Sequence, residues 1–317
     1  MNHLESAFKG KNSFWRYVVM LAGVLIASNT IGAIPLFIAY AVKSANNPQI
    51  IGKIASNPSD LSVLGFDPNI GLLLLLIPFV AGIIAFGFLV KPLNGRSFKQ
   101  TINGTNSIRW KRFFISGIVW AILSGLYLVI YLGIDPANFT LNNKSITLLY
   151  LTIISFLFIP FQAGFEEVLF RGYLMQGFAV LAHNRWFPLV TTSVFFGLLH
   201  AFNPEVKDFG FITMMPQYLL FGFVFGIASI MDDGIEVAMG AHTANNIFLC
   251  IFVTNSSSAL QTSALYVQKN VYPWIEFSGL LIASVIFIIA LKLIFRWKDF
   301  SCLWGKIHKS EEPLQTV

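Results

Sequence analysis

The chain has 317 residues, of which 56% are hydrophobic and only 11% are charged. Soluble domains carry about 25% charged residues, so this composition excludes an ordinary soluble protein. The net charge of +6 does not indicate nucleic-acid binding, because the basic residues stand beside apolar runs, where they orient membrane segments. The two cysteines, Cys250 and Cys302, predict neither a disulfide framework nor a cysteine-based zinc site.

Apolar runs recur along the whole chain. A helix needs about 20 apolar residues to cross the hydrocarbon core of a bilayer. Such runs occupy residues 14–42, 70–90, 113–134, 146–165, 186–202, 212–231, 235–254 and 274–295. An amphipathic stretch, 166–182, continues the fourth run. The sequence therefore predicts an all-α, polytopic integral membrane bundle of about eight transmembrane helices, forming a single membrane domain over residues 1–317.

The basic residues are distributed unevenly between the two sides of the membrane. With the N-terminus in the cytoplasm, the segment 91–112 is cytoplasmic and carries basic residues but no acidic one. The basic residues on the cytoplasmic side are Lys9, Lys11, Arg16, Lys91, Arg96, Lys99, Arg109, Lys111, Arg112, Arg185, Arg296, Lys298, Lys306 and Lys309. Those on the opposite side are Lys43, Lys53, Lys144, Lys207 and Lys269. The positive-inside rule thus places both termini in the cytoplasm, and we expect a bacterial cell membrane.

Ionisable and amide residues gather in the apolar runs between residues 166 and 246. In the first group, Glu167 and Arg171 are four positions apart, so on a helix they share a face and can pair. Glu166 lies about 100° around the helix and remains available for chemistry. Ionisable residues inside spans are costly and usually face a bundle interior, although a salt-bridged helix end would show the same pattern.

The second and third groups contain histidines. Phe196 stands one turn before His200 on the same face, and His242 stands one turn before Asn246. Taken singly, such residues are also typical of helix packing through hydrogen bonds between spans. Asn245 adds a further amide to the third group. Together, Glu166, His200, His242 and Asn246 supply a carboxylate, two imidazoles and a carboxamide.

This set suffices for peptide hydrolysis. Glu166 is the candidate base that deprotonates a water molecule, with His200 positioning or activating it, while His242 and Asn246 stabilise the oxyanion. In a second arrangement, Glu166, His200 and His242 hold a divalent metal such as zinc, which lowers the pKa of bound water. The sequence leaves open whether a metal is present or none is needed. It lacks the His-Glu-x-x-His and Gly-x-Ser-x-Gly patterns of other hydrolases.

The three motifs, in this order, resemble the signature of the CPBP family of intramembrane proteases, which includes CAAX proteases and bacteriocin-processing proteins. That signature is Glu-Glu-x-x-x-Arg, Phe-x-x-x-His and His-x-x-x-Asn on successive helices, so residues 146–254 are the expected catalytic core. The resemblance implies an eight-helix bundle and an endopeptidase acting near the cytoplasmic face on a peptide or a membrane-anchored protein. It implies that Glu166 activates water with His200.

The same resemblance assigns the other motif residues. It implies that His242 and Asn246 form the oxyanion site, while Glu167, Arg171 and Phe196 support it. A catalytically silent scaffold or a bacteriocin self-immunity protein, binding a partner through the same cavity, is the alternative. A small-solute transporter is a third, and the absence of an evident inverted repeat counts against it.

The depth of the residues in the membrane raises one difficulty. Glu166 lies late in an inward-going run and His200 lies late in an outward-going one, which places them at opposite depths. A single helix over 146–182 would be about 55 Å long, too long for an upright crossing. A kink at Pro160 would let Glu166 lie deeper.

Overall fold

The computed structural model describes residues 3–52, 61, 65–142 and 145–309 of the chain. Helices dominate these residues, and three short strands join them. The α-helices are α1 (Phe14–Ala27), α2 (Ile34–Asn46), α4 (Pro68–Asn94), α5 (Phe98–Asn103), α6 (Trp110–Ile134), α7 (Ser145–Glu167), α8 (Met175–Ala182), α9 (Trp186–Leu199), α10 (Pro204–Phe209), α11 (Phe211–Met231), α12 (Glu236–Phe252) and α13 (Pro273–Phe295). Three segments are 3-10 helices: η1 (Glu5–Lys9), η4 (Pro136–Asn138) and η6 (Phe300–Trp304). Two are π-helices: η2 (Ser28–Gly32) and η5 (Val168–Leu174). The strands are β1 (Phe139–Leu141), β2 (Val253–Thr254) and β3 (Tyr266–Gln268).

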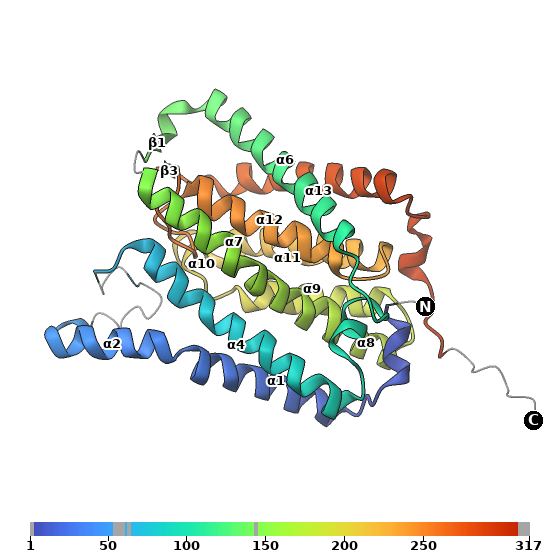
Figure 1. The fold of residues 1–317 in the computed structure, drawn as a ribbon. Helices are drawn as coiled ribbons and strands as arrows, with labels where there is room; N and C mark the ends of the chain where they lie inside the picture. Colours follow the sequence, from blue (N-terminus) through green and yellow to red (C-terminus); the bar gives the residue numbers. More distant parts are fainter. Residues whose placement is uncertain (1–2, 53–60, 62–64, 143–144, 310–317) are drawn as a thin grey trace, which may run out of the picture.

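Most of the long helices lie roughly along one axis (Figure 1). Among the described residues, six helical segments are long and apolar enough to cross a membrane: Phe14–Asn46, Pro68–Asn94, Trp110–Ile134, Ile146–Ala182, Phe211–Met231 and Pro273–Phe295. The α9 and α12 helices are shorter, but α9 packs on α11, and α12 packs on α6 and α7. The predicted all-α polytopic membrane bundle is confirmed, and the count of eight is approximate because α9 and α12 fall short of a full crossing.

Large apolar side chains cover the outer faces of these helices. Phe88 of α4 is 78% exposed, Val129 of α6 is 66% exposed and Leu293 of α13 is 72% exposed. Exposed apolar surface of this extent would be unfavourable in water and is what a bilayer solvates. The chain is therefore an integral membrane protein.

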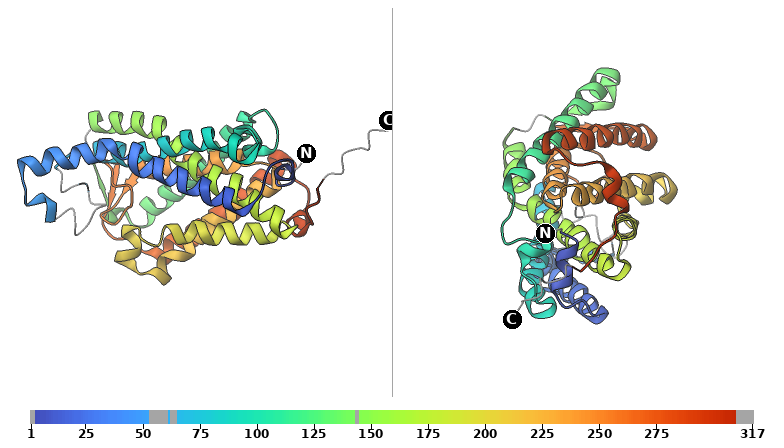
Figure 2. Two further views of the ribbon diagram at one scale, coloured as in Figure 1. Left: turned by 90° about the horizontal axis from the view of Figure 1, so that it is seen from below. Right: turned by 90° about the vertical axis from the view of Figure 1, so that its right-hand side faces the viewer.

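The N-terminal segment, the residues after α13 and the connections α4–α6, α8–α9 and α11–α12 gather at one end of the bundle, here called the terminal end (Figures 1 and 2). Backbone N–H groups donate across these connections from Lys11 to Asn94 (2.8 Å), from Ile235 to Ile102 (2.9 Å) and from Ile307 to His183 (3.0 Å). Arg109 of the α5–α6 connection also pairs with Glu236 at 2.6 Å. These contacts join the connections at the terminal end to one another.

The remaining connections gather at the opposite end, here called the far end. There β3 pairs with β1 in antiparallel and with β2 in parallel orientation, so the strand order is β1-β3-β2. Asn69, at the start of α4, joins two further segments, because its Nδ2 donates to the Thr147 carbonyl (3.0 Å) and its Oδ1 accepts from the Ser263 N–H (3.2 Å). Of the basic residues assigned to this side by sequence, Lys53 and Lys144 lie outside the described residues.

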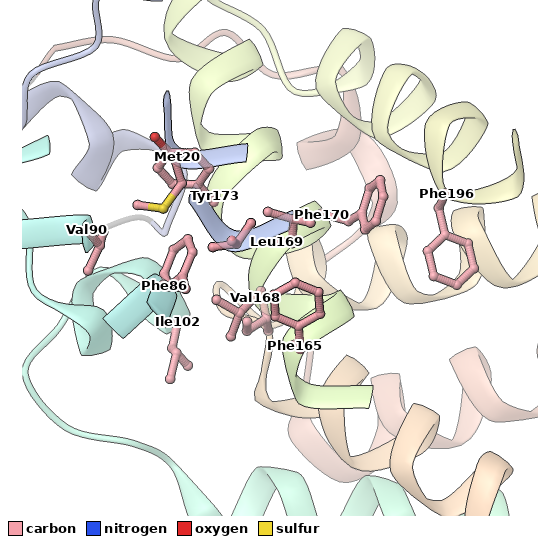
Figure 3. Close-up of a cluster of buried hydrophobic side chains, with 12 residues drawn as sticks. Met20, Phe86, Val90, Ile102, Phe165, Val168, Leu169, Phe170, Tyr173 and Phe196 are labelled. Atoms are coloured by element: carbon pink, nitrogen blue, oxygen red, sulfur yellow. The ribbon is translucent and has the colours of Figure 1, made fainter. Parts of the chain in front are cut away.

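The helix over 146–182 runs without a break through the predicted boundary at 165, so that boundary is wrong. Within it, η5 is a π-helical stretch, in which each turn holds more residues than in an α-helix and which is frequent at functional sites. Residues 165–173 pack between α4 and α9: Figure 3 shows Val168 and Leu169 near Phe86, and Phe170 facing Phe196. The Phe170 and Phe196 rings meet edge to face at 5.6 Å.

This continuous helix resolves the depth difficulty. Glu166 lies about four turns before Ala182, and His200 lies about four turns after Trp186. Because Ala182 and Trp186 flank the same short connection at the terminal end, the two functional residues reach a similar depth from it. The opposite depths expected from the sequence came from ending the fourth span at residue 165.

Candidate functional site

A cavity of about 570 Å³ runs into the bundle and brings together most of the residues predicted from the three motifs. Five of those residues line it: Glu166, Phe196, His200, His242 and Asn246. They come from α7, α9, the end of α9 and α12, so helices far apart in sequence build one wall. Glu167 and Arg171 do not line the cavity and lie behind it, with side chains that are 0% exposed.

Glu167 binds both Arg171 and His242. Its Oε1 accepts from Arg171 Nη1 (2.9 Å) and from His242 Nδ1 (2.7 Å). The Arg171 guanidinium also donates to the Gly222 carbonyl (3.2 Å) and lies 4.2 Å from the centre of the Phe196 ring. The predicted Glu167–Arg171 pair is thus present, and it additionally holds the His242 ring in place.

Glu166 points into the cavity with one oxygen free. Its Oε1 accepts from Gln162 Nε2, while its Oε2 has no hydrogen-bond partner among the described residues. That Oε2 lies 3.7 Å from His242 Nε2, so the carboxylate and the imidazole face the same small volume. A carboxylate oxygen in this position can accept a proton from a bound water molecule.

One hydrogen bond fixes the tautomer of the His200 ring. Its Nδ1 lies 2.7 Å from the Phe196 carbonyl oxygen, which only accepts, so the ring donates from Nδ1. A neutral His200 therefore has an unprotonated Nε2. The Phe196 ring lies between the two histidines, 4.7 Å from the His200 ring and 6.0 Å from the His242 ring. Tyr218 stacks on His200 at 4.5 Å.

A chain of amides leads from Trp120 to Glu166. Trp120 Nε1 donates to Asn245 Oδ1 (3.1 Å), Asn245 Nδ2 donates to Asn246 Oδ1 (2.9 Å), and Asn246 Nδ2 donates to Gln162 Oε1 (2.8 Å). An indole N–H can only donate, so it fixes the orientation of the first amide and, through it, of the next two. The last amide, that of Gln162, then presents its N–H to Glu166.

Sequence reasoning missed three of these residues. Gln162 precedes Glu166 by four positions in an apolar run, so the i, i+4 spacing that predicts the Glu167–Arg171 pair was also present here and was overlooked. Trp120 and Tyr218 carry no such signal, because an aromatic residue in a span is typical of ordinary packing. Their roles depend on contacts between helices that the sequence does not place side by side.

The residues fit the alternative metal arrangement poorly. Among the described residues, no group of three His, Cys, Asp or Glu side chains converges closely enough to hold a metal ion. The Nδ1 bonds of His242 and His200 leave only Nε2 of each ring for a metal, and these two nitrogens do not form such a group with Glu166. The proposed trio of Glu166, His200 and His242 is therefore not assembled as a ligand set, and the mechanism below uses no metal.

A comparison with known protein families finds a match over the segment that contains this site. Residues 145–248 match the family model described as "Type II CAAX prenyl endopeptidase Rce1-like". The resemblance predicted from the three motifs is confirmed. The matched segment begins with α7 and ends within α12, so it contains every motif residue from Glu166 to Asn246. Over this segment the chain is thus similar to CAAX-type membrane peptidases.

The chain is also similar to a curated bacterial protein. It is 29% identical over 259 residues to the "Uncharacterized protein YyaK" of Bacillus subtilis (strain 168), covering 81% of this chain and 84% of that protein. No solved structure matches the chain significantly. The comparisons give no support to a bacteriocin-immunity role.

Proposed function

We propose that the chain is an intramembrane endopeptidase in which Glu166 activates the attacking water. The observation that carries this proposal is the free Glu166 Oε2, 3.7 Å from His242 Nε2 at the deep end of the cavity. The proposed catalytic core is 146–254 within one membrane domain, with His200, His242 and Asn246 as the other catalytic residues. The proposed substrate is a peptide or a membrane-anchored protein in a bacterial cell membrane.

The site supplies the elements of each step. Glu166 Oε2 takes a proton from water, and the unprotonated Nε2 of His200 accepts a hydrogen bond from the same water and orients it. The water oxygen bonds to the carbonyl carbon of the substrate, whose oxygen becomes the oxyanion. When the C–N bond breaks, Glu166 returns its proton to the leaving amine. No covalent intermediate with the protein is required.

The oxyanion is stabilised from α12. Asn246 Nδ2 uses one N–H on Gln162 and retains a second for the substrate. His242 turns its Nε2 towards the same volume, because its Nδ1 is held by the Glu167 carboxylate, and this Nε2 is the second proposed partner of the oxyanion. Preorganised donors of this kind each contribute about 10²–10³ in rate.

The test compares purified wild type with Glu166→Ala on a panel of membrane-proximal peptides, with and without chelator. We expect cleavage by the wild type and none by Glu166→Ala, with the same elution volume for both in size-exclusion chromatography. His200→Ala and His242→Ala should behave like Glu166→Ala. Cleavage by Glu166→Ala at the wild-type rate would overturn the proposal, and inhibition by chelator would replace the metal-free mechanism with a metal-dependent one.

A further inference from the structure

The cavity extends from the catalytic residues towards the far end only. Its outer lining comes from the far-end segments: Tyr131, Phe139, Asn203, Glu205, Phe209, Met214, Gln217, Asn255, Ser258, Gln268 and Glu276. No lining residue comes from the terminal-end connections 95–109, 183–185 or 232–235. A peptide that reaches Glu166 through this cavity therefore approaches from the far end.

Packed side chains close the cavity towards the terminal end. Behind Glu166, the Glu167–Arg171 pair is fully buried, and Phe170 and Phe225 are 4% and 0% exposed. Closer to the terminal end, Asp232 is held by Arg109 (3.2 Å) and by the Trp297 indole (2.7 Å). A polypeptide segment could pass this layer only if those contacts separated.

The charges assign the two ends to opposite sides of the membrane. The basic residues placed in the cytoplasm by the positive-inside rule all belong to terminal-end segments, whereas Lys43, Lys207 and Lys269 belong to the far end. The far end is thus the extracytoplasmic face. This placement differs from action near the cytoplasmic face, which the family resemblance implied.

Glu205 lies on the route into the cavity with one carboxylate oxygen unoccupied. Tyr218 donates its hydroxyl to Glu205 Oε1 and accepts from Asn203 Nδ2 (3.0 Å). Because the Tyr218 ring also stacks on His200, this contact places Glu205 beside the catalytic histidine. Glu205 Oε2 is buried and has no hydrogen-bond partner among the described residues.

The rest of the lining favours a cationic ligand. The carboxylates of Glu166, Glu205 and Glu276 line the cavity, and no Lys or Arg of the described residues does. Its walls are otherwise largely aromatic and aliphatic. An unpaired carboxylate in apolar surroundings gains from a cationic partner, and an acidic side chain there would be repelled.

We propose that substrate peptides enter from the extracytoplasmic face and that a basic side chain of the peptide binds Glu205. The term substrate here rests on the proposed function, whereas the entry side and the Glu205 subsite are tested without proteolysis.

Cysteine labelling in intact bacterial cells tests the entry side. In a background of Cys250→Ala and Cys302→Ala, single cysteines replace Lys269 at the far end, Ser258 in the cavity lining and Lys99 at the terminal end. With a membrane-impermeant maleimide, we expect Lys269→Cys and Ser258→Cys to react in intact cells and Lys99→Cys only after lysis. Labelling of Lys99→Cys in intact cells, with Ser258→Cys reacting only after lysis, would overturn the entry side.

Binding of model peptides tests the subsite. An apolar fluorescent peptide with one central lysine is compared, by anisotropy with Glu166→Gln protein in detergent, with the same peptide carrying norleucine or glutamate. We expect the lysine peptide to bind roughly tenfold more tightly than the norleucine peptide, and the glutamate peptide more weakly than both. Glu205→Gln should abolish the lysine preference.

Glu276→Gln is the matched control, because Glu276 lines the same cavity but already accepts from Gln268 Nε2 (2.9 Å). It should keep the lysine preference. Retention of that preference in Glu205→Gln, or equal binding of the three peptides to the parent protein, would overturn the subsite. Because neither experiment measures cleavage, a failure of the protease proposal would remain visible as a separate result.

Discussion

At the scale of single residues, Glu167 holds together two groups with different tasks. Its carboxylate forms an ion pair with Arg171 and accepts a hydrogen bond from His242 Nδ1. The side chains of Glu167 and Arg171 are both 0% exposed. The adjacent Glu166 has its free oxygen in the cavity. The division of labour between adjacent carboxylates therefore follows from which helix face each occupies.

We expect Glu167→Ala to lower both folded yield and activity. Removal of one partner of a buried ion pair leaves an uncompensated charge and costs on the order of 3–5 kcal/mol. The midpoint of thermal unfolding in detergent and the monodisperse fraction after purification measure the effect, with Glu166→Ala as the matched control. A Glu167→Ala protein with wild-type stability and activity would refute the supporting role.

The amide chain predicts an effect of Gln162 that is specific to catalysis. Gln162→Met keeps the side-chain length but removes the N–H that orients Glu166, so kcat should fall roughly 10–100-fold while KM changes little. Trp120→Phe, which removes the fixed donor at the other end, should lower kcat in the same direction. Steady-state kinetics on the best cleaved peptide give both constants.

Gln217→Met is the control for that experiment. Gln217 also lines the cavity and donates one hydrogen bond, to the Pro273 carbonyl (3.1 Å), but has no link to Glu166. Its kcat should remain near the wild-type value. An increase in KM without a change in kcat for Gln162→Met would assign Gln162 to substrate binding and contradict its positioning role.

At the scale of elements, close approach of α11 to α9 brings the second motif onto the site. A Cβ added to Gly222 would lie 2.7 Å from the Ser193 carbonyl oxygen, so only glycine allows the two helices to touch there. Gly222 and Gly226 are four positions apart on α11 and form a small-x-x-x-small pair, which thus has a packing role. Arg171 depends on the same contact, because it donates to the Gly222 carbonyl.

We therefore expect Gly222→Ala to destabilise the protein by about 1–3 kcal/mol, the usual cost of overpacking. The shift of the unfolding midpoint in detergent measures this cost. Gly87→Ala is the control, since a Cβ on Gly87 would meet no atom within 4 Å. Equal midpoints for the two variants would contradict the importance of the α9–α11 contact.

At the scale of the whole molecule, the N-terminal segment fastens the terminal end. His3 Nε2 donates to the Arg171 carbonyl (3.0 Å), and its Nδ1 accepts from Gln176 Nε2 (3.1 Å). These partners require a neutral ring. Burial lowers the pKa of His3 below its ordinary value of 6.5, against the opposing effects of the Arg171 carbonyl, Asp233 and Glu236.

The sign of the resulting pH dependence follows from linkage. As pH falls through 6.5, His3 of the unfolded chain takes up a proton that the folded chain refuses, so stability present above that pH is lost below it. Thermal unfolding in detergent from pH 8 to pH 5 should show a falling midpoint, with a smaller fall in His3→Gln. His308→Gln is the control, because His308 is exposed, and it should keep the pH dependence of the wild type. A His3→Gln protein with the same pH dependence as the wild type would contradict the effect of His3.

The sequence by itself determined the class of protein, the helices and the identity of the motif residues. Apolar runs predict spans because only hydrocarbon solvates such segments, and the predicted limits agree with α4, α6, α11 and α13 to within a few residues. The i, i+4 spacing also predicted the Glu167–Arg171 pair, because contacts along one helix depend only on position.

Only the tertiary structure decided how these residues meet. The depth of Glu166 depended on the continuity of α7, η5 and α8, since an amphipathic stretch does not reveal from sequence whether it lies inside a bundle. The link from Trp120 to Gln162 and the place of Glu205 depend on contacts between helices that are remote in sequence. Local spacing carries no information about such contacts, because they are fixed by how whole helices pack around the cavity.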